Sequence, residues 1–183
     1  MRVIAGTRKG HLLLAPRHRQ VRPTSSRART VLFDVLGQET RATRVLDLFA
    51  GAGGLGIEAL SRGAAWVDFV ESSRQHAQLI QKNLQKTHLD DHAAVLVEDA
   101  FAFLARRGEA HPPYDLVLAD PPYDFDGYSR LLQALAAPAL LAASGRLVLE
   151  TSVRLRLPPA PSGLQLRSER RISETRLLFY QRE

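Results

Sequence analysis

From residue 44 onward, short runs of hydrophobic residues alternate with longer stretches in which hydrophobic positions recur every three or four residues. The short runs predict strands at 45–49, 66–70, 93–97, 116–119 and 146–150, and the longer stretches predict helices at 55–62, 72–87, 100–107 and 128–141. Strands that alternate with amphipathic helices are typical of βαβ units, in which helices cover both faces of a parallel sheet. The pattern therefore predicts an α/β fold.

The N-terminal part of the chain lacks this alternation. Residues 2–5 and 11–14 predict a small β-hairpin, and the polar residues at 24–26 predict the start of an amphipathic helix that ends at Gly37. We therefore treat residues 1–40 as an N-terminal extension.

The rhythm changes again near the C-terminus. After the prolines at 158–161, residues 164–167 and 176–180 predict two strands with no helix between them, and hence an antiparallel pair. These strands complete a main domain that we place at 41–183.

The composition excludes several classes of protein. A chain of 183 residues is long enough for one main domain, and its lack of cysteine excludes disulfides, thiolate metal ligands and a cysteine nucleophile. The histidines do not occur at metal-ligand spacing, so we expect no metal site, and we expect His76, His88 and His92 to be solvated. We find neither a run of roughly 20 hydrophobic residues nor a signal-peptide pattern, so we expect a cytoplasmic protein that does not bind a membrane.

The net charge of +6 is distributed unevenly along the sequence. Residues 1–30 contain eight Arg and Lys and no acidic residue, residues 31–153 carry −6, and residues 154–183 carry +4. Basic ends around an acidic middle indicate a polyanion as partner, nucleic acid first, although a solvated arm of an arginine-rich protein would carry the same charge. The candidate nucleic-acid contacts in the N-terminal extension are Arg8, Lys9, Arg17, Arg19 and Arg22.

A glycine-rich turn joins the strand at 45–49 to the following helix. Gly51, Gly53 and Gly56 match G-x-G-x-x-G, in which glycine lets the backbone turn tightly and approach a ligand. Glu71 follows Gly51 by 20 residues at the end of the next strand, where a carboxylate can accept hydrogen bonds from both hydroxyls of a ribose. Together these features predict a nucleoside cofactor, and they fit NAD, FAD and S-adenosylmethionine alike.

The segment Asp120-Pro121-Pro122-Tyr123 directly follows the strand at 116–119. Ligands of open α/β sheets bind at the carboxyl ends of the strands, so we expect this segment and the glycine-rich turn to face one crevice. The prolines remove two backbone donors, which leaves the Asp120 carboxylate and the Pro121 carbonyl as an acceptor pair for an exocyclic amine. Tyr123 offers a flat face for a stacked base. Hydride transfer has no evident use for such an acceptor pair, so NAD and FAD are disfavoured.

At these residues the sequence resembles a known family. Asp-Pro-Pro-Tyr after the fourth strand is similar to the amino-methylation motif of S-adenosylmethionine-dependent methyltransferases, and nearly the whole chain resembles the bacterial 16S ribosomal RNA guanine-N2 methyltransferases. The resemblance is carried by Arg2-Val-Ile-Ala-Gly6, the segment 22–33 that begins Arg22-Pro-Thr, Leu46-Asp-Leu-Phe-Ala-Gly51, Asp120-Pro-Pro-Tyr123 and Leu178-Phe-Tyr-Gln-Arg182-Glu. The chain departs from the family at Ser26, where an acid is usual, and at Ser173-Glu174-Thr175, where a Gly-Gln-Val-like stretch is usual.

The resemblance implies a Rossmann-like class I methyltransferase fold, with a mostly parallel seven-stranded sheet, a terminal antiparallel pair and a small N-terminal hairpin and helix. It implies S-adenosylmethionine as cofactor, S-adenosylhomocysteine (SAH) as product and no metal. The implied substrate is a guanine of 16S ribosomal RNA, within a small-subunit assembly particle, and the expected oligomeric state is a monomer. The implied cofactor-binding residues are Asp47, Phe49, Gly51, Gly53, Glu71, Ser72, Asp99 and Ala100, and the implied catalytic residues are Asp120, Pro121, Pro122 and Tyr123.

Within this set, the resemblance assigns the ribose hydroxyls to Glu71 and the adenine amino group to Asp99. Asp47 is a candidate for a hydrogen bond either to the methionine ammonium or to the glycine-rich turn. Two other functions stay open: an adenine-N6 methyltransferase, which uses the same amine chemistry, and a non-catalytic RNA-binding assembly factor. The lack of an insert long enough for a DNA target-recognition domain argues against the first, and the intact motif at 120–123 argues against the second.

Overall fold

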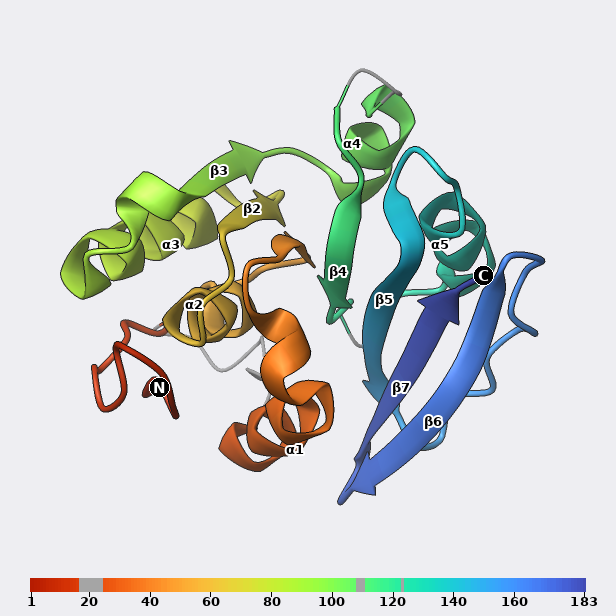
Figure 1. Cartoon of the computed structure of the whole chain (residues 1–183), viewed down its shortest axis with the longest axis horizontal. Coiled ribbons are helices and arrows are strands. Elements are labelled where there is room, and N and C mark those ends of the chain that lie inside the picture. Colours follow the sequence, from red (N-terminus) through yellow and green to blue (C-terminus); the bar gives the residue numbers. More distant parts are fainter. Residues whose placement is uncertain (17–24, 108–110, 123) are drawn as a thin grey trace.

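The computed structural model describes residues 1–16, 25–107, 111–122 and 124–183. Seven strands form one sheet with helices on both faces (Figure 1). Two short 3-10 helices lie at Gly37–Thr40 and Asp90–His92. The other elements are α1 (Ser26–Leu36), β1 (Arg44–Leu48), α2 (Gly54–Ser61), β2 (Trp66–Glu71), α3 (Arg74–Thr87), β3 (Ala93–Val97), α4 (Ala100–Arg106), β4 (Tyr114–Ala119), α5 (Tyr128–Leu135), β5 (Leu141–Ser152), β6 (Leu164–Ile172) and β7 (Thr175–Arg182).

The strand order is β3-β2-β1-β4-β5-β7-β6. Strands β1 to β5 are parallel, and β7 is inserted antiparallel between β5 and β6. This is the predicted Rossmann-like class I methyltransferase architecture, with its terminal antiparallel pair. After β3 at one edge of the sheet, the chain crosses to the other side of β1 and continues with β4. The carboxyl ends of β1 and β4 therefore flank the point where open α/β sheets bind ligands.

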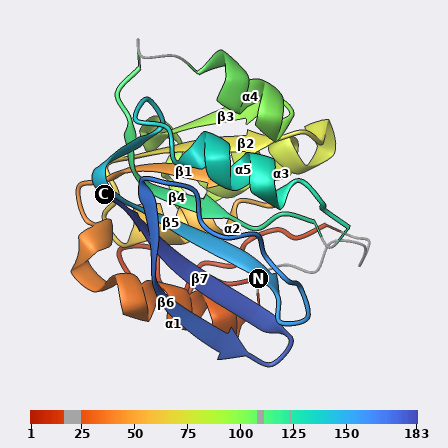
Figure 2. The ribbon, with the colours of Figure 1, turned by 90° about the vertical axis from the view of Figure 1, so that its right-hand side faces the viewer.

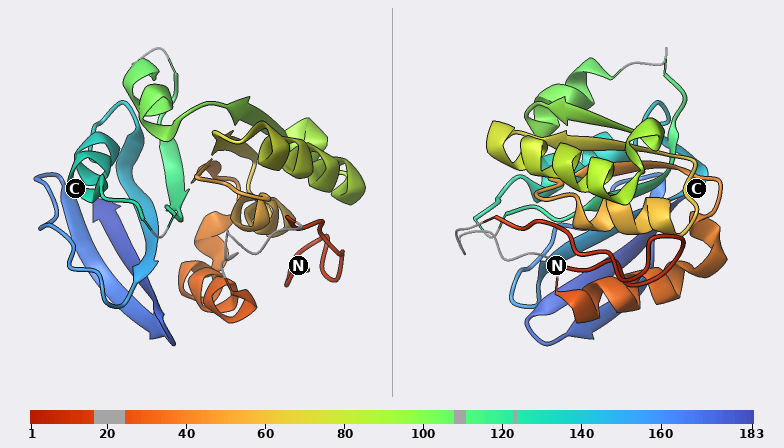
Figure 3. Two further views of the ribbon diagram at one scale, coloured as in Figure 1. Left: turned by 180° about the vertical axis from the view of Figure 1, so that it is seen from behind. Right: turned by 90° about the vertical axis from the view of Figure 1, so that its left-hand side faces the viewer.

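Two hydrophobic layers hold the sheet between the helices. Helices α1, α2 and α3 cover one face, and α4 and α5 cover the other (Figures 1 and 3). Strand β1 contributes side chains to both layers, because Val45 belongs to the first layer while Leu46 and Leu48 belong to the second. A strand buried on both faces is hydrophobic at nearly every position, as the short runs in the sequence are.

The predicted N-terminal hairpin is present in reduced form. Its two arms form an isolated antiparallel bridge between Arg2 and Leu12 and share three backbone hydrogen bonds of 2.9–3.0 Å, but they do not extend into regular strands. The carboxylate of Glu58, fully buried on α2, accepts hydrogen bonds from the backbone amides of Ile4 (2.7 Å) and Ala5 (3.0 Å). Val3 packs into the same hydrophobic layer as α2, so this part of the extension is fixed to the main sheet.

The predicted C-terminal antiparallel pair forms, although its turn lacks the glycine that the related family usually has. Strand β6 ends at Ile172, which pairs directly with Thr175 at the start of β7. Ser173 lies between them with a φ of 55°, a left-handed conformation that costs a serine more than a glycine. Helix α1 packs against β6 and β7, which extend the sheet beyond β5 (Figure 2).

Helix α5 is shorter than the predicted range 128–141, since it ends at Leu135. Pro138 explains the difference, because it has no backbone N–H and disfavours helical geometry at the residue before it. Leu141 is instead the first residue of β5. Among the described residues, no helix has both the length and the hydrophobicity needed to cross a membrane.

Candidate active site

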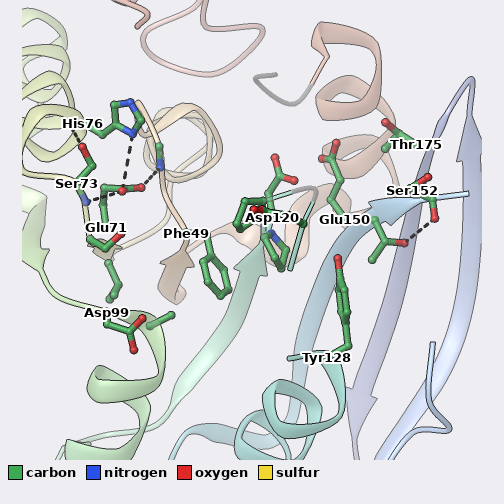
Figure 4. Close-up of a pocket in the computed structure, with 18 of the residues that line it drawn as sticks. Phe49, Glu71, Ser73, His76, Asp99, Asp120, Tyr128, Glu150, Ser152 and Thr175 are labelled. Carbon is green, nitrogen blue, oxygen red and sulfur yellow. Dashed lines mark hydrogen bonds and ion pairs between the residues drawn. The ribbon is translucent and has the colours of Figure 1, made fainter. Parts of the chain in front are cut away.

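A pocket of about 600 Å³ lies at the carboxyl ends of the parallel strands. It extends from the ends of β1, β2 and β3 to the ends of β4 and β5, with α1 and β7 contributing at its far side. Figure 4 shows Glu71 and Asp99 on one side of the pocket, Glu150, Ser152 and Thr175 on the other, and Asp120 between them. The predicted cofactor motif and the predicted substrate motif therefore face the same space.

Glu71, the last residue of β2, is held by two backbone amides. The N–H of Gly51 donates to one carboxylate oxygen (2.8 Å) and the N–H of Ser73 donates to the other (2.8 Å). His76 on α3 places its Nδ1 3.8 Å from the carboxylate (Figure 4). A carboxylate has about four acceptor sites, so roughly two remain for a ligand after the two amides.

One glycine of the glycine-rich turn lines the pocket, and another packs against the hydrophobic core. Gly51 lines the pocket with a φ of 56°, and a Cβ added to it would meet open space. Gly53 is the N-cap of α2, and a Cβ there would press on Ile57 and Ile80 at 3.2–3.3 Å. Of these two predicted cofactor contacts, the structure thus brings Gly51 to the pocket and packs Gly53 against helices.

Asp47 lies under the turn rather than along the pocket wall. It is 2% exposed, and its carboxylate accepts a hydrogen bond from the N–H of Gly56 in the first turn of α2 (2.8 Å). Burial raises the pKa of Asp47 well above that of an ordinary aspartate, although this hydrogen bond opposes the shift. Of the two partners considered for Asp47, the glycine-rich turn is the one seen here.

The other predicted cofactor contacts line the same side of the pocket: Phe49, Ser72, Asp99 and Ala100. Asp99 caps α4, because its carboxylate accepts from the amides of Phe101 (2.9 Å) and Ala102 (3.0 Å). This cap fixes the side chain at the mouth of the pocket, where its other oxygen can face a ligand.

Phe49 and Tyr128 line the pocket, and Phe125 packs against both of them. The Phe49 ring meets Phe125 edge to face at a centroid distance of 5.3 Å, and Phe125 meets Tyr128 at 4.9 Å. Tyr128 opens α5 and lines the pocket, and its pKa is raised by burial and, to a lesser degree, by the charge of Asp120. The phenol therefore stays protonated and can donate a hydrogen bond.

Asp120, Pro121 and Pro122 follow β4 and line the pocket as predicted. The carbonyl of Pro122 accepts a hydrogen bond from the N–H of Phe125 (3.0 Å). Tyr123 lies outside the described residues. Asp120 directly follows the last residue of β4, and this strand end brings it beside the cofactor side of the pocket.

The pocket is strongly acidic. Its lining includes six carboxylates and, among the described residues, no Lys or Arg: Glu71, Glu98, Asp99, Asp120, Asp124 and Glu150. Such a wall attracts a cation and hydrogen-bond donors, and it repels phosphate.

Sequence reasoning missed several pocket residues. His76 was expected to be solvated and instead lines the pocket, because the turn after β2 brings the start of α3 over Glu71. Glu150 could have been found, since it ends the predicted strand at 146–150, but Ser25 and Thr175 could not, because they reach the pocket only through tertiary packing.

The candidate nucleic-acid contacts are only partly described. Arg8 is half-buried and donates a hydrogen bond to the carbonyl of His88 (3.3 Å), whereas Lys9 is exposed. Arg17, Arg19 and Arg22 lie outside the described residues.

Comparison with known proteins agrees with this geometry. The chain matches the family model Conserved hypothetical protein 95 over residues 1–181. Ribosomal RNA small subunit methyltransferase D of Escherichia coli K12 is 34% identical over 183 residues, which cover 100% of this chain and 90% of that protein. The structure of yhhF from Escherichia coli, assigned as a methyltransferase, superposes on this chain with a TM-score of 0.88 and 34% sequence identity. The match covers 100% of this chain and 98% of the yhhF chain.

A more distant neighbour shows the fold alone. SMU.776, assigned as a methyltransferase and solved in complex with SAH, is 14% identical with a TM-score of 0.70, covering 88% of this chain and 50% of its own. The resemblance drawn from the sequence motifs is thus confirmed, and the chain belongs to the family described as Conserved hypothetical protein 95.

Proposed function

We propose that this protein transfers a methyl group from S-adenosylmethionine to the exocyclic N2 amine of a guanine in small-subunit (16S) ribosomal RNA. The observation that carries the proposal is the position of Asp120, Pro121 and Pro122, which line one pocket with Glu71 and Gly51. An acceptor group for an amine thus lies directly beside a site suited to a nucleoside cofactor.

The charge of the pocket supports S-adenosylmethionine over NAD or FAD. Its carboxylates suit a cofactor with a positive sulfonium, whereas the pyrophosphate of NAD or FAD would meet repulsion and, among the described lining residues, no Arg or Lys. The acceptor sites left on Glu71 suit two ribose hydroxyls, and we assign the adenine amine to the Asp99 carboxylate, which lines the same side of the pocket. The complex of SMU.776 with SAH, on the same fold, agrees with this assignment.

When bound, S-adenosylmethionine supplies an electrophilic methyl group. The task of the protein is to make the guanine amine nucleophilic, because its lone pair is delocalised into the ring. If the Asp120 carboxylate and the Pro121 carbonyl accept the two N2 hydrogens, they favour a pyramidal nitrogen whose lone pair points at the methyl group. The Asp120 charge also stabilises the positive charge that N2 gains until its extra proton leaves.

The substrate is proposed to be RNA because the related Escherichia coli protein is named for small-subunit ribosomal RNA, and because this chain carries a basic N-terminal extension. The target base must leave its stack to reach the pocket, so an unpaired base costs less to bind than a paired one. We expect the basic extension to hold the surrounding phosphates.

A methyl-transfer assay with labelled cofactor tests the proposal on three substrates: naked 16S ribosomal RNA, assembled small subunits and duplex DNA. Nucleoside analysis of the product should show N2-methylguanosine from one of the RNA substrates. N6-methyladenosine would support the adenine alternative, and SAH binding with no methyl transfer would support a non-catalytic assembly factor.

A further inference from the structure

The ends of β4 and β5 place two carboxylates side by side. The strands are parallel, and the register pairs Ala119 with Leu149, so the next residues along the two strands are Asp120 and Glu150. Neighbouring strands lie roughly 4.8 Å apart. Side chains alternate between faces along a strand, and Leu118 and Val148, two residues earlier, both enter the α1–α3 layer. Asp120 and Glu150 therefore share that face, as Figure 4 shows.

The position of Glu150 is fixed on both sides. Strand β5 pairs with β4 on one side and with β7 on the other, where Glu150 lies opposite Leu177. The residue is 8% exposed, and it lines the far half of the pocket. Its carboxylate therefore faces the substrate side of the pocket from a rigid strand, and not from a loop.

Two carboxylates side by side at the pocket suit a ligand with several hydrogen-bond donors in a row, because each carboxylate has about four acceptor sites. Hydrogen bonds from N–H groups to ionised carboxylates are also stronger than those to neutral acceptors. The Watson–Crick edge of guanine offers three such hydrogens in a row, one on N1 and two on N2. Adenine instead presents an acceptor at N1 beside its amine.

We propose that Glu150 reads the target base by accepting a hydrogen bond from the N1–H of guanine, while Asp120 and the Pro121 carbonyl accept from N2. This inference rests on the proposed guanine methylation and adds the residue that selects guanine. Each of the three hydrogens on the guanine edge then has its own acceptor. An adenine in the same pocket would turn its N1 lone pair toward the Glu150 carboxylate, which repels it.

The magnitude of the selection follows from the missing hydrogen bond. A charge-assisted hydrogen bond corresponds to an affinity factor of about 10–100, and sites built to bind a donor reject analogues that lack it. The base 2-aminopurine keeps the exocyclic amine at C2 but carries an acceptor at N1 and lacks O6, so the change of preference in a Glu150 variant, which leaves O6 contacts in place, reports the N1 contact. Wild-type protein should therefore methylate guanine about 10–100 times more efficiently than 2-aminopurine.

The experiment first maps the base that wild-type protein methylates in 16S ribosomal RNA. RNA with guanine or 2-aminopurine at that position is then prepared by splinted ligation, and kcat/KM is measured on both. Glu150→Gln should lower kcat/KM on guanine about 10–100-fold and bring the guanine to 2-aminopurine ratio close to one, because a glutamine amide can donate to the N1 acceptor. Asp124→Asn, which removes a carboxylate elsewhere on the pocket wall, should leave the ratio unchanged.

Each outcome separates the inference from the function on which it rests. Glu150→Gln that folds, binds SAH normally and keeps the wild-type ratio would overturn the reading role, whether its activity is intact or equally reduced on both RNAs. If wild-type protein methylates guanine N2 in that experiment, the proposed function still stands. Methylation of adenine N6, or none at all, by the wild-type protein would overturn both.

Discussion

The Glu71 carboxylate offers the sharpest test of the cofactor site, because it supports the backbone of the glycine-rich turn and is also proposed to bind the cofactor. It accepts hydrogen bonds from the amides of Gly51 and Ser73, each at 2.8 Å, and its remaining acceptor sites are assigned to the ribose hydroxyls. Glu71→Ala removes both sets of contacts. We therefore expect the variant to lose affinity for SAH and also to lose stability without a ligand.

The two losses have different sizes. Charge-assisted hydrogen bonds contribute about 1.5–3 kcal/mol each, but two bonds from one side chain to one ribose are not additive. A net loss of about 2–3 kcal/mol corresponds to an SAH affinity about 30–150-fold weaker. The freed amides of Gly51 and Ser73 can meet water in the pocket, so the free energy of unfolding should fall by only about 1–2 kcal/mol.

Isothermal titration with SAH and urea denaturation of the same samples measure both quantities. Asp115→Ala is a matched control, since Asp115 accepts a hydrogen bond from the backbone of Arg44 (2.8 Å) at the opposite end of the sheet. It should lose stability and keep the affinity for SAH. Glu71→Ala with SAH affinity within about twofold of wild type would refute the ribose assignment and leave Glu71 a structural support of the turn.

Three further predictions address the acceptor, the buried carboxyl and the basic extension. Asp120→Ala should lower turnover at least about 100-fold while SAH affinity stays within a few-fold, and unchanged turnover would remove Asp120 from the reaction. The raised pKa of Asp47 means that its stabilising contribution is present below about pH 3.9 and is lost as the pH rises through its folded pKa. Asp47→Asn should therefore flatten that part of the stability profile in urea titrations, and an unchanged profile would contradict the assignment. Replacing Arg17, Arg19 and Arg22 with Gln should flatten the salt dependence of RNA affinity by about two to three units of slope, whereas an unchanged slope with a lower Tm would make the extension purely structural.

Much of the fold follows from local patterns in the sequence. Buried parallel strands and amphipathic helices leave strong periodic signals, which is why the five parallel strands and the order of the helices could be predicted. The C-terminal antiparallel pair could also be predicted, because no helix separates its two strands. Features set by one residue's neighbours in space could not. Helix α5 ends at Leu135 and β5 begins at Leu141, and a sequence pattern of hydrophobic residues does not show where between them the helix stops. The contact of Ile4 with the buried carboxylate of Glu58 joins residues 54 positions apart, so no local pattern indicates it.

The candidate site divides in the same way. Glu71 and Asp120 could be found because strand ends are readable from sequence, and the carboxyl ends of parallel strands meet at one edge. His76 could not, because a helical histidine looks solvated until the turn after β2 is known. Gly53 and Asp47 belong to the cofactor motif by sequence, yet the structure uses them for packing and for holding the turn, since a tight turn must satisfy its own buried amides before it can meet a ligand.

The acidic residues in the middle of the sequence are partly gathered around the pocket in the folded protein. Residues 31–153 contain sixteen acidic residues, and six of them line the pocket. The negative charge is thus concentrated where a sulfonium cofactor and the donor edge of a guanine are proposed to bind. The described residues of the pocket wall do not favour a polyanion, so we propose that the phosphate contacts come from the basic N-terminal extension. In this proposal the basic N-terminal extension holds the RNA backbone, and the acidic pocket accepts a single unstacked base.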